Sequence, residues 1–282
     1  GKGYPIWNRD IDLSGKEDLK RFFASHTPLS IEQVNQLFIK SKEGYVFKKF
    51  NDKGSTKSIV PIGVFHRKRT RKGMAYCPNC LKQDPYFKIS WRYQSSILCT
   101  ECNCFLEQEC KKCKSPIAFH RLYINDNRSI TKNVKMRYCS ECGYDLTRAI
   151  RAKKLPSDIQ LEYQRYVNKT IELGYNDKVV YSFQYIEALS YLLSVLCSSR
   201  MRDRFRVSFC NYFELPFIDV GLTRDAVLDM EIRRLLLPRV HMMFQKDEIF
   251  RAIVRRKEVT KSDIDFDHGL PSWVLSKFYY YS

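Results

Sequence analysis

The feature that most constrains this chain is a set of four Cys-x-x-Cys pairs confined to its middle third. Two intervening residues let both thiolates of a pair reach one tetrahedral ion, and two pairs complete a four-coordinate zinc site. The 18 residues between Cys80 and Cys99 suit a zinc ribbon, and the 25 between Cys113 and Cys139 are longer but workable. We therefore predict two structural Zn²⁺ ions held by eight ligands: Cys77, Cys80, Cys99, Cys102, Cys110, Cys113, Cys139 and Cys142.

The spacing leaves the grouping of the pairs open, since sequential and cross-braced arrangements use the same eight residues. Cys104 could replace Cys102 as a ligand, and His120 is a further candidate that we leave out of the set. Cys197 and Cys210 lie in apolar helical surroundings and are predicted to be core residues. A closed four-thiolate site keeps no position for water, so these ions are expected to stabilise the fold rather than to catalyse.

The positive charge follows the cysteines. Of the net charge of +18, residues 61–154 carry +13, residues 1–60 carry +4 and residues 155–282 carry +1. A hydrophobic content of 44% in 282 residues is enough for a packed core and argues against a mainly disordered chain. We predict a mainly α fold with small zinc-ribbon or knuckle modules. Its parts are a helical N-terminal segment (1–60), a basic tandem zinc module (61–154) and a helical C-terminal domain (155–282).

Helical periodicity and capping residues predict two short helices near the start of the chain, at 16–24 and 31–38. Ser30 and Gln33 form a capping box for the second of them. Two such helices around a Thr-Pro turn could be a DNA-reading helix-turn-helix, or they could serve packing alone. Downstream, further helices are predicted at 157–173, 182–196, 223–237, 246–257 and 271–280, with Ser157 and Ser182 as N-caps and Gly174, Pro238 and Pro271 as breaks.

Three runs of Lys and Arg flank or interrupt the cysteine pairs. Joined by two zinc ions, they could form one surface for nucleic-acid phosphates, with Tyr86 and Tyr123 as aromatic neighbours. Taken singly, each run could equally be a solvated loop. The predicted nucleic-acid-binding residues are Arg67, Lys68, Arg69, Arg71, Lys72, Lys111, Lys112, Lys114, Arg148 and Arg151, and the same surface includes Lys153 and Lys154.

The sequence offers little for catalysis. Phosphate-binding glycine motifs, nucleophile elbows and zinc-protease or deaminase signatures are absent, so we predict no enzyme and no cofactor besides zinc. Asp263, Asp265 and Asp267, next to His268, could hold Mg²⁺ for a nuclease, but a solvated turn between helices is the preferred interpretation. The chain lacks an apolar stretch of membrane-spanning length and a secretory leader, so we expect a cytoplasmic protein.

Three segments together resemble the TniQ/TnsD family of bacterial transposition proteins. They are YCPNCLKQDPYFKISWRY (76–93), LCTECNCFLEQECKKCKSPI (98–117) and YCSECGYDL (138–146). Cys102 stands where the family usually has His, a swap between two zinc ligands. Cys104 follows on a position that is not a ligand in the family, which favours Cys102. The usual Pro-containing opening of the family is not evident before residue 15, which fits an N-terminus that is missing or diverged.

The resemblance implies a non-enzymatic selector of transposition targets in the bacterial cytoplasm. TniQ-type members link a target-recognition complex, such as an RNA-guided CRISPR effector with its guide RNA, to an AAA+ ATPase that regulates transposition. TnsD-type members bind the DNA of an attachment site directly. We expect the adaptor role, with target-duplex DNA and the ATPase as partners. Direct DNA binding is the alternative, a homodimer is left open, and no membrane is involved.

Overall fold

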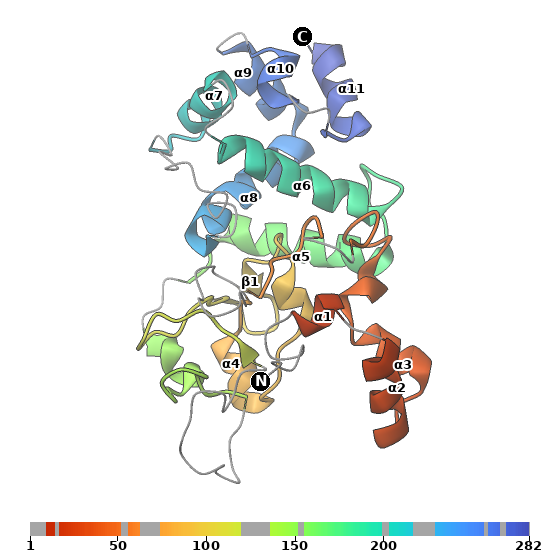
Figure 1. Cartoon of the computed structure of the whole chain (residues 1–282). Helices are drawn as coiled ribbons and strands as arrows, with labels where there is room; N and C mark the ends of the chain where they lie inside the picture. The colour runs from red at the N-terminus through yellow and green to blue at the C-terminus, as the bar shows by residue number, and fades with distance from the viewer. Residues whose placement is uncertain are drawn as a thin grey trace. The chain divides into compact units, whose positions relative to one another are not determined.

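A computed structural model of the whole chain describes residues 10–14, 17–51, 56–62, 74–119, 136–151, 155–198, 203–216, 229–256, 259–265 and 269–281. The fold is mainly α, as predicted (Figure 1). The chain forms two compact units. Unit 1 consists of Gly1–Glu43 and Lys49–Pro156, and unit 2 consists of Gly44–Lys48 and Ser157–Ser282. Residues from both the predicted N-terminal segment and the predicted zinc module thus belong to unit 1.

Unit 1 combines short helices with small hairpins. Its helix α3 begins where the sequence predicts, because Ser30 accepts a hydrogen bond from the Gln33 amide and the Gln33 side chain accepts one from the Ser30 amide. The elements are α1 (Ile11–Ser14), α2 (Glu17–His26), α3 (Ile31–Gln36), η1 (Ile39–Lys42), α4 (Pro78–Gln83), η2 (Ile89–Arg92), β1 (Leu98–Cys99), β2 (Cys104–Phe105) and η4 (Leu146–Arg151).

A buried arginine ties the start of unit 1 to its middle. The Arg92 side chain is fully buried, and its Nη1 donates to Asp10 Oδ1 at 2.8 Å and to Asp12 Oδ2 at 2.7 Å. Its Nη2 also contacts the Asp10 carboxylate and donates to the Val60 carbonyl at 3.0 Å. Asp10 in turn accepts the Ile62 amide at 3.1 Å. One guanidinium thus fixes α1, the segment before residue 63 and η2 together.

Unit 2 is a bundle in which α5, α6 and α8 pack on one another and α7 packs on α9 (Figure 1). Residues 44–48 belong to it because Ser182 Oγ donates to the Tyr45 carbonyl at 2.8 Å and Glu187 accepts the Lys48 amide at 2.9 Å. Its helices are α5 (Asp158–Leu173), α6 (Ser182–Leu196), α7 (Arg204–Tyr212), α8 (Met230–Gln245), α9 (Asp247–Arg255), α10 (Lys261–Ile264) and α11 (Ser272–Tyr281).

The predicted helix at 157–173 is confirmed, with Ser157 in a capping box and Gly174 in the left-handed conformation at φ 82°. Two other predictions about the helix ends of this unit were wrong. Tyr181, not Ser182, is the N-cap of α6. Pro238 lies inside α8 instead of ending a helix. A proline frees the carbonyl four residues earlier, and here Gln160 of α5 donates its amide to that Arg234 carbonyl at 3.1 Å.

The aspartates considered for a nuclease site serve the fold of unit 2. Asp263 accepts the Thr260 amide and hydroxyl, both at 2.7 Å, as part of the capping box of α10. Asp265 accepts the Leu270 amide at 2.9 Å. Both carboxyl groups thus hold local turns of unit 2, and Asp263 Oδ1 is buried without a hydrogen-bond partner. Asp267 and His268 lie outside the described residues.

In the part of the chain that is described, no helix has the length and hydropathy needed to cross a membrane.

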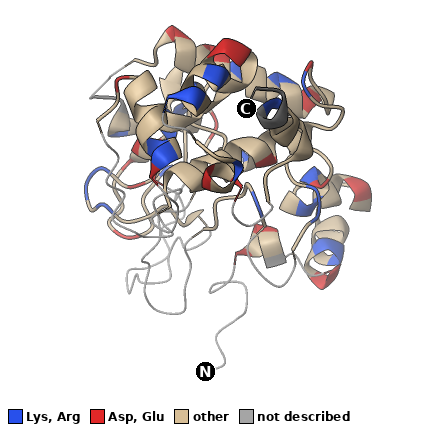
Figure 2. Ribbon diagram, turned by 90° about the horizontal axis from the view of Figure 1, so that it is seen from above, with Lys and Arg blue, Asp and Glu red and all other residues tan. Residues whose placement is uncertain are grey.

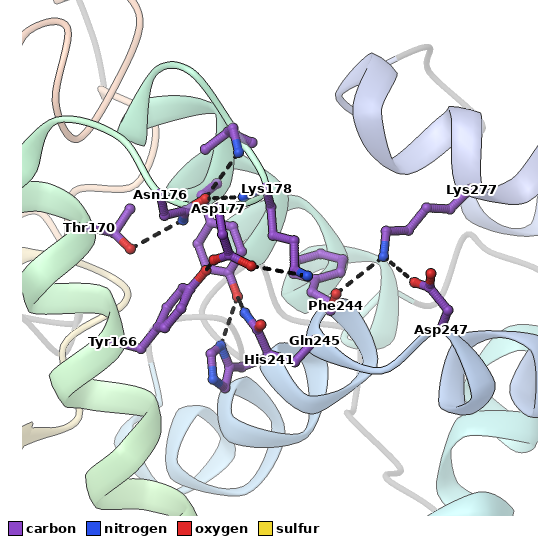
Figure 3. A network of polar contacts seen from close by, with 12 residues as sticks. Tyr166, Thr170, Asn176, Asp177, Lys178, His241, Phe244, Gln245, Asp247 and Lys277 are labelled. Atoms are coloured by element: carbon purple, nitrogen blue, oxygen red, sulfur yellow. Dashed lines mark hydrogen bonds and ion pairs between the residues drawn. The ribbon is translucent and has the colours of Figure 1, made fainter.

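A buried histidine sits among aromatic rings where α5, α6 and α8 meet (Figure 3). His241 Nδ1 shares a 2.7 Å hydrogen bond with the hydroxyl of Tyr185, to which Gln245 also donates at 3.3 Å. The rings of Tyr163 and Tyr166 lie against the imidazole at centroid distances of 5.6 and 4.8 Å. Burial lowers the pKa of His241 to about 4, so the imidazole is neutral at physiological pH.

Unit 2 should therefore lose stability in mild acid. The imidazole takes up a proton more readily in the unfolded chain, where its pKa is about 6.5. The stability that the neutral His241 imidazole contributes is complete above pH 6.5. It declines by about 3 kcal/mol in all as the pH falls from 6.5 to 4. Hydrogen exchange of α5 and α8 between pH 4 and 7.5 measures this loss. His241→Gln, which keeps an acceptor for Tyr185 without titrating, should flatten the profile. An unchanged profile would contradict the assignment.

Candidate metal centres

The eight predicted cysteine ligands form two clusters of four. Cys77, Cys80, Cys99 and Cys102 make the first cluster, and Cys110, Cys113, Cys139 and Cys142 make the second. Within each cluster the four sulfurs lie within 4.8 Å of one another. The grouping is sequential rather than cross-braced.

The sulfur distances suit a tetrahedral zinc ion. Zn–S bonds of about 2.3 Å place tetrahedral sulfurs about 3.8 Å apart. Cys80 Sγ lies 3.6 Å from Cys99 Sγ and 3.5 Å from Cys102 Sγ. The sulfurs of Cys110 and Cys142 are 3.7 Å apart, as are those of Cys113 and Cys139. Four thiolates at these distances could bind metal ions and match the donor set of structural zinc.

Three of the four knuckles repeat the same hairpin. In each, the residue before the first cysteine pairs with the residue six positions after that cysteine, giving the pairs Leu98–Phe105, Glu109–Pro116 and Tyr138–Asp145. The residue after the second cysteine always has a positive φ, with values of 47° at Asn103, 59° at Lys114 and 68° at Gly143. This turn brings both sulfurs of a knuckle to the same side. The repeat is conformational, since only one of these three residues is glycine.

The remaining knuckle is built on a helix. Cys77 is the N-cap of α4, and its sulfur accepts the Cys80 amide at 3.4 Å. Pro78 occupies the first helical position, where its missing N–H costs nothing. The helix dipole and the free amides of the first turn favour negative charge at this end. The hydrogen bond with Cys104 acts in the opposite direction and raises the pKa of Cys77.

Tyr76 joins the two clusters through the backbone. Its amide donates to the Glu107 carbonyl and its carbonyl accepts the Glu107 amide, both at 2.8 Å. Its buried hydroxyl donates to the Glu109 carbonyl at 3.2 Å. Glu107 and Glu109 lie between Cys104 and Cys110, so one stretch of chain contacts the first knuckle and leads into the second cluster. The two clusters are therefore parts of one folded module.

Each cluster contains a thiol that ionises easily. A hydrogen bond from Cys77 is the main cause of a pKa of about 5 at Cys99. At Cys113, burial opposes ionisation, but hydrogen bonds from the Ser115 side chain and backbone outweigh it and lower the pKa to about 7. Zinc binds thiolates, so these two residues are already suited to coordination near neutral pH.

Cys104 lies beside the first cluster. Its sulfur is 3.5 Å from that of Cys77 and accepts a hydrogen bond from the Asn79 amide at 3.7 Å. It is not one of the four mutually close sulfurs. His120 lies outside the described residues. Cys197 and Cys210 are buried in unit 2, with 6% and 2% of their surfaces exposed.

The predicted nucleic-acid-binding residues are only partly covered by the structure. Lys111, Lys112, Lys114 and Arg148 are exposed. Two of them meet glutamates, since Lys111 pairs with Glu107 at 2.6 Å and Lys114 with Glu109 at 3.2 Å. Figure 2 shows Lys and Arg positions interspersed with Asp and Glu positions over the described helices. Arg67, Lys68, Arg69, Arg71 and Lys72 lie outside the described residues, as do Tyr123, Lys153, Lys154 and the Arg151 side chain.

Comparison with known families assigns the first part of the chain. Residues 5–106 match the family model of TniQ. Residues 5–106 are therefore similar to the TniQ family, and the match covers less than half of the chain. The match includes all four cysteines of the first cluster and ends before the second. It also starts at residue 5, so the conclusion that the family's opening is not evident before residue 15 was wrong. No curated protein and no solved structure matches the chain.

The sequence analysis did not identify Asp10 and Asp12 as partners of Arg92. Both lie in the matched region and bind Arg92, which lies in the segment 76–93 that resembles the family. Nothing in the spacing of two aspartates and one arginine about 80 residues away indicates a contact. The signal that could have found them is the combination of an apolar sequence around Arg92 with a charge that needs a buried partner.

Proposed function

We propose that this protein is a non-enzymatic adaptor for the choice of transposition targets. In this proposal it links a target-recognition complex, an RNA-guided CRISPR effector on DNA, to an AAA+ ATPase that regulates transposition in the bacterial cytoplasm. The TniQ match over residues 5–106 carries the proposal, because it associates the chain with transposition. The segments 76–93, 98–117 and 138–146, which resemble the TniQ/TnsD family, support the link to transposition, and the nearly neutral C-terminal third favours the adaptor.

The geometry of the clusters supports a binding role. Four thiolates around each ion would leave no position for a water molecule or a substrate, so zinc bound there would act on the fold alone. The ions would hold the exposed side chains of Lys112 and Arg148 on a rigid module. Such a module presents a surface to partners without needing a reaction centre.

A co-purification experiment tests the adaptor role. The full chain is mixed with the ATPase regulator, with and without the guide-RNA effector bound to its target duplex. The proposal expects ATPase recruitment to the target only when all components are present. Recruitment of the ATPase to target DNA that is independent of this chain would contradict it.

Direct reading of an attachment site is the second candidate, favoured by the net charge of +13 over residues 61–154. Binding to attachment-site and scrambled duplexes is measured from 50 to 200 mM salt. The direct-selector candidate expects the attachment site to be preferred by about 10³-fold or more. Equal affinities with a steep salt dependence would exclude it and leave sequence-blind phosphate contact.

The exposed lysines of the third knuckle should supply part of the salt dependence. Replacing Lys111, Lys112 and Lys114 by Gln is expected to reduce the slope of log K against log salt by up to about 0.9 per lost phosphate contact. The glutamate partners of Lys111 and Lys114 should keep the reduction below the value for three full contacts. The matched control replaces three exposed arginines of unit 2, Arg204, Arg255 and Arg256, by Gln. An equal effect of both variants would contradict a role specific to the zinc module.

A further inference from the structure

The first cluster contains one thiol more than a tetrahedral ion can use. Cys104 Sγ is 3.5 Å from Cys77 Sγ, as close as Cys80 Sγ is to Cys102 Sγ. The two hairpins of the second cluster have no cysteine at the corresponding position. There the residue five positions after the first cysteine is Ser115 in one hairpin and Tyr144 in the other. The extra thiol therefore distinguishes the first cluster from the second.

We propose that Cys77 and Cys104 form a redox-sensitive pair that removes one ligand from the first cluster when it is oxidised. The inference rests on zinc occupying that cluster. It does not depend on the partners proposed above. The ligand class is a two-electron peroxide oxidant, with hydrogen peroxide as the probe.

The two sulfurs differ in their access to solvent. Cys104 is partly exposed on β2, whereas Cys77 is fully buried at the start of α4. Zinc bound by Cys77, Cys80, Cys99 and Cys102 would leave the Cys104 thiol uncoordinated. A peroxide molecule therefore reaches an uncoordinated thiol on Cys104 before it reaches the sulfur of Cys77. The Asn79 amide, which donates to the Cys104 sulfur, holds that sulfur beside Cys77.

The reaction balances with peroxide alone. Cys104–SH and H₂O₂ give Cys104–SOH and one water molecule. The Cys77 thiolate then attacks the oxidised sulfur, the S–S bond forms, and hydroxide leaves and takes up a proton to become a second water. Two sulfurs lose one electron each, and the two peroxide oxygens gain them. The sulfurs must approach from 3.5 Å to about 2.05 Å, which side-chain rotation can supply.

Loss of Cys77 as a ligand leaves the first zinc ion with three thiolates. Because binding energy in such sites is folding energy, the ion should leave and the surrounding fold should loosen. Cys77 caps α4 and follows Tyr76, which pairs with Glu107. The disulfide would thus act on the segment that connects the two clusters. A dithiol reductant restores both thiols and allows zinc to bind again.

Zinc release under peroxide tests the proposal on the full zinc-loaded chain. Zinc content is measured first, so that an empty first cluster is recognised as failure of the zinc assignment. Peroxide should then release one zinc per wild-type chain, and peptide mapping should show a Cys77–Cys104 disulfide. Cys104→Ser, which places at this hairpin position the residue that the next hairpin already has, should slow the first release by about tenfold or more.

The second cluster is the internal control, since its described residues include no fifth thiol. Equal release rates from wild type and Cys104→Ser would overturn the proposal. So would a wild-type map in which the new disulfides join other cysteines. If Cys104→Ser does not fold, the disulfide map of the wild-type chain decides alone, and absence of the Cys77–Cys104 link overturns the proposal.

Discussion

Cys139→Ser should abolish zinc binding at the second cluster and unfold the zinc module of unit 1, and Cys80→Ser should do the same at the first cluster. Both residues are buried in clusters whose sulfurs lie within 4.8 Å of one another. Structural zinc contributes about 10–16 kcal/mol of apparent binding free energy in small zinc modules. Whole domains are stable by only about 5–15 kcal/mol. Losing one ion should therefore exceed what the remaining packing can offset.

Metal analysis and thermal unfolding measure this effect. The wild-type chain should contain two zinc ions, and each variant one or none. Cys210→Ser in unit 2 is the control, because this buried thiol lies outside both clusters and its loss should leave two ions bound. Two zinc ions in Cys80→Ser would show that Cys80 is not a ligand. One zinc ion or none in the wild-type chain would refute the eight-ligand assignment.

Arg92→Met should produce the second large effect, a loss of about 3–5 kcal/mol in the stability of unit 1. The guanidinium is fully buried, and its removal leaves the carboxylates of Asp10 and Asp12 without their partner. Burial already raises the pKa of Asp12 against the opposing effect of Arg92. The cost should therefore be smaller at low pH, where the carboxyl groups of the variant are protonated.

Thermal unfolding and hydrogen exchange near Asp10 and Val60 measure this loss, which should lower the melting temperature by about 10 °C. Arg21→Met removes an exposed arginine from α2 and should change the melting temperature little. Adding Asp10→Asn and Asp12→Asn to Arg92→Met should recover much of the loss, because no buried charge then remains. A melting temperature unchanged by Arg92→Met would contradict the role of Arg92 as the tie between these segments.

The helix boundaries show where local sequence signals are sufficient. Ser30 with Gln33, and Ser157 alone, predicted two helix starts that the structure confirms. Capping is decided within four residues, so the sequence contains the whole interaction. Pro238 shows the opposite case. Its local signal is a helix end, but the Gln160 side chain of another helix satisfies the carbonyl that the proline leaves free.

For the metal centres too, the sequence predicts one part and the tertiary structure decides another. Which cysteines bind together within a knuckle follows from the Cys-x-x-Cys spacing, because two intervening residues bring two sulfurs to one ion. The spacing does not decide which knuckles share an ion, and the structure groups them in sequence order. It also gives no sign that Asn103 and Lys114 would adopt the left-handed turn that Gly143 adopts readily. The division of residues 1–60, 61–154 and 155–282 into separate parts stays a prediction.

The sequence by itself determined the mainly α class, which eight cysteines form the two clusters, and the resemblance to the TniQ/TnsD family. Each of these depends on composition or on residues close together in the chain. Only the tertiary structure decided that Arg92 holds Asp10 and Asp12, that His241 is buried among tyrosines, and that Cys104 lies beside Cys77. These contacts join residues 27 to 82 positions apart. Their energies depend on burial and distance, which exist only once the chain has folded.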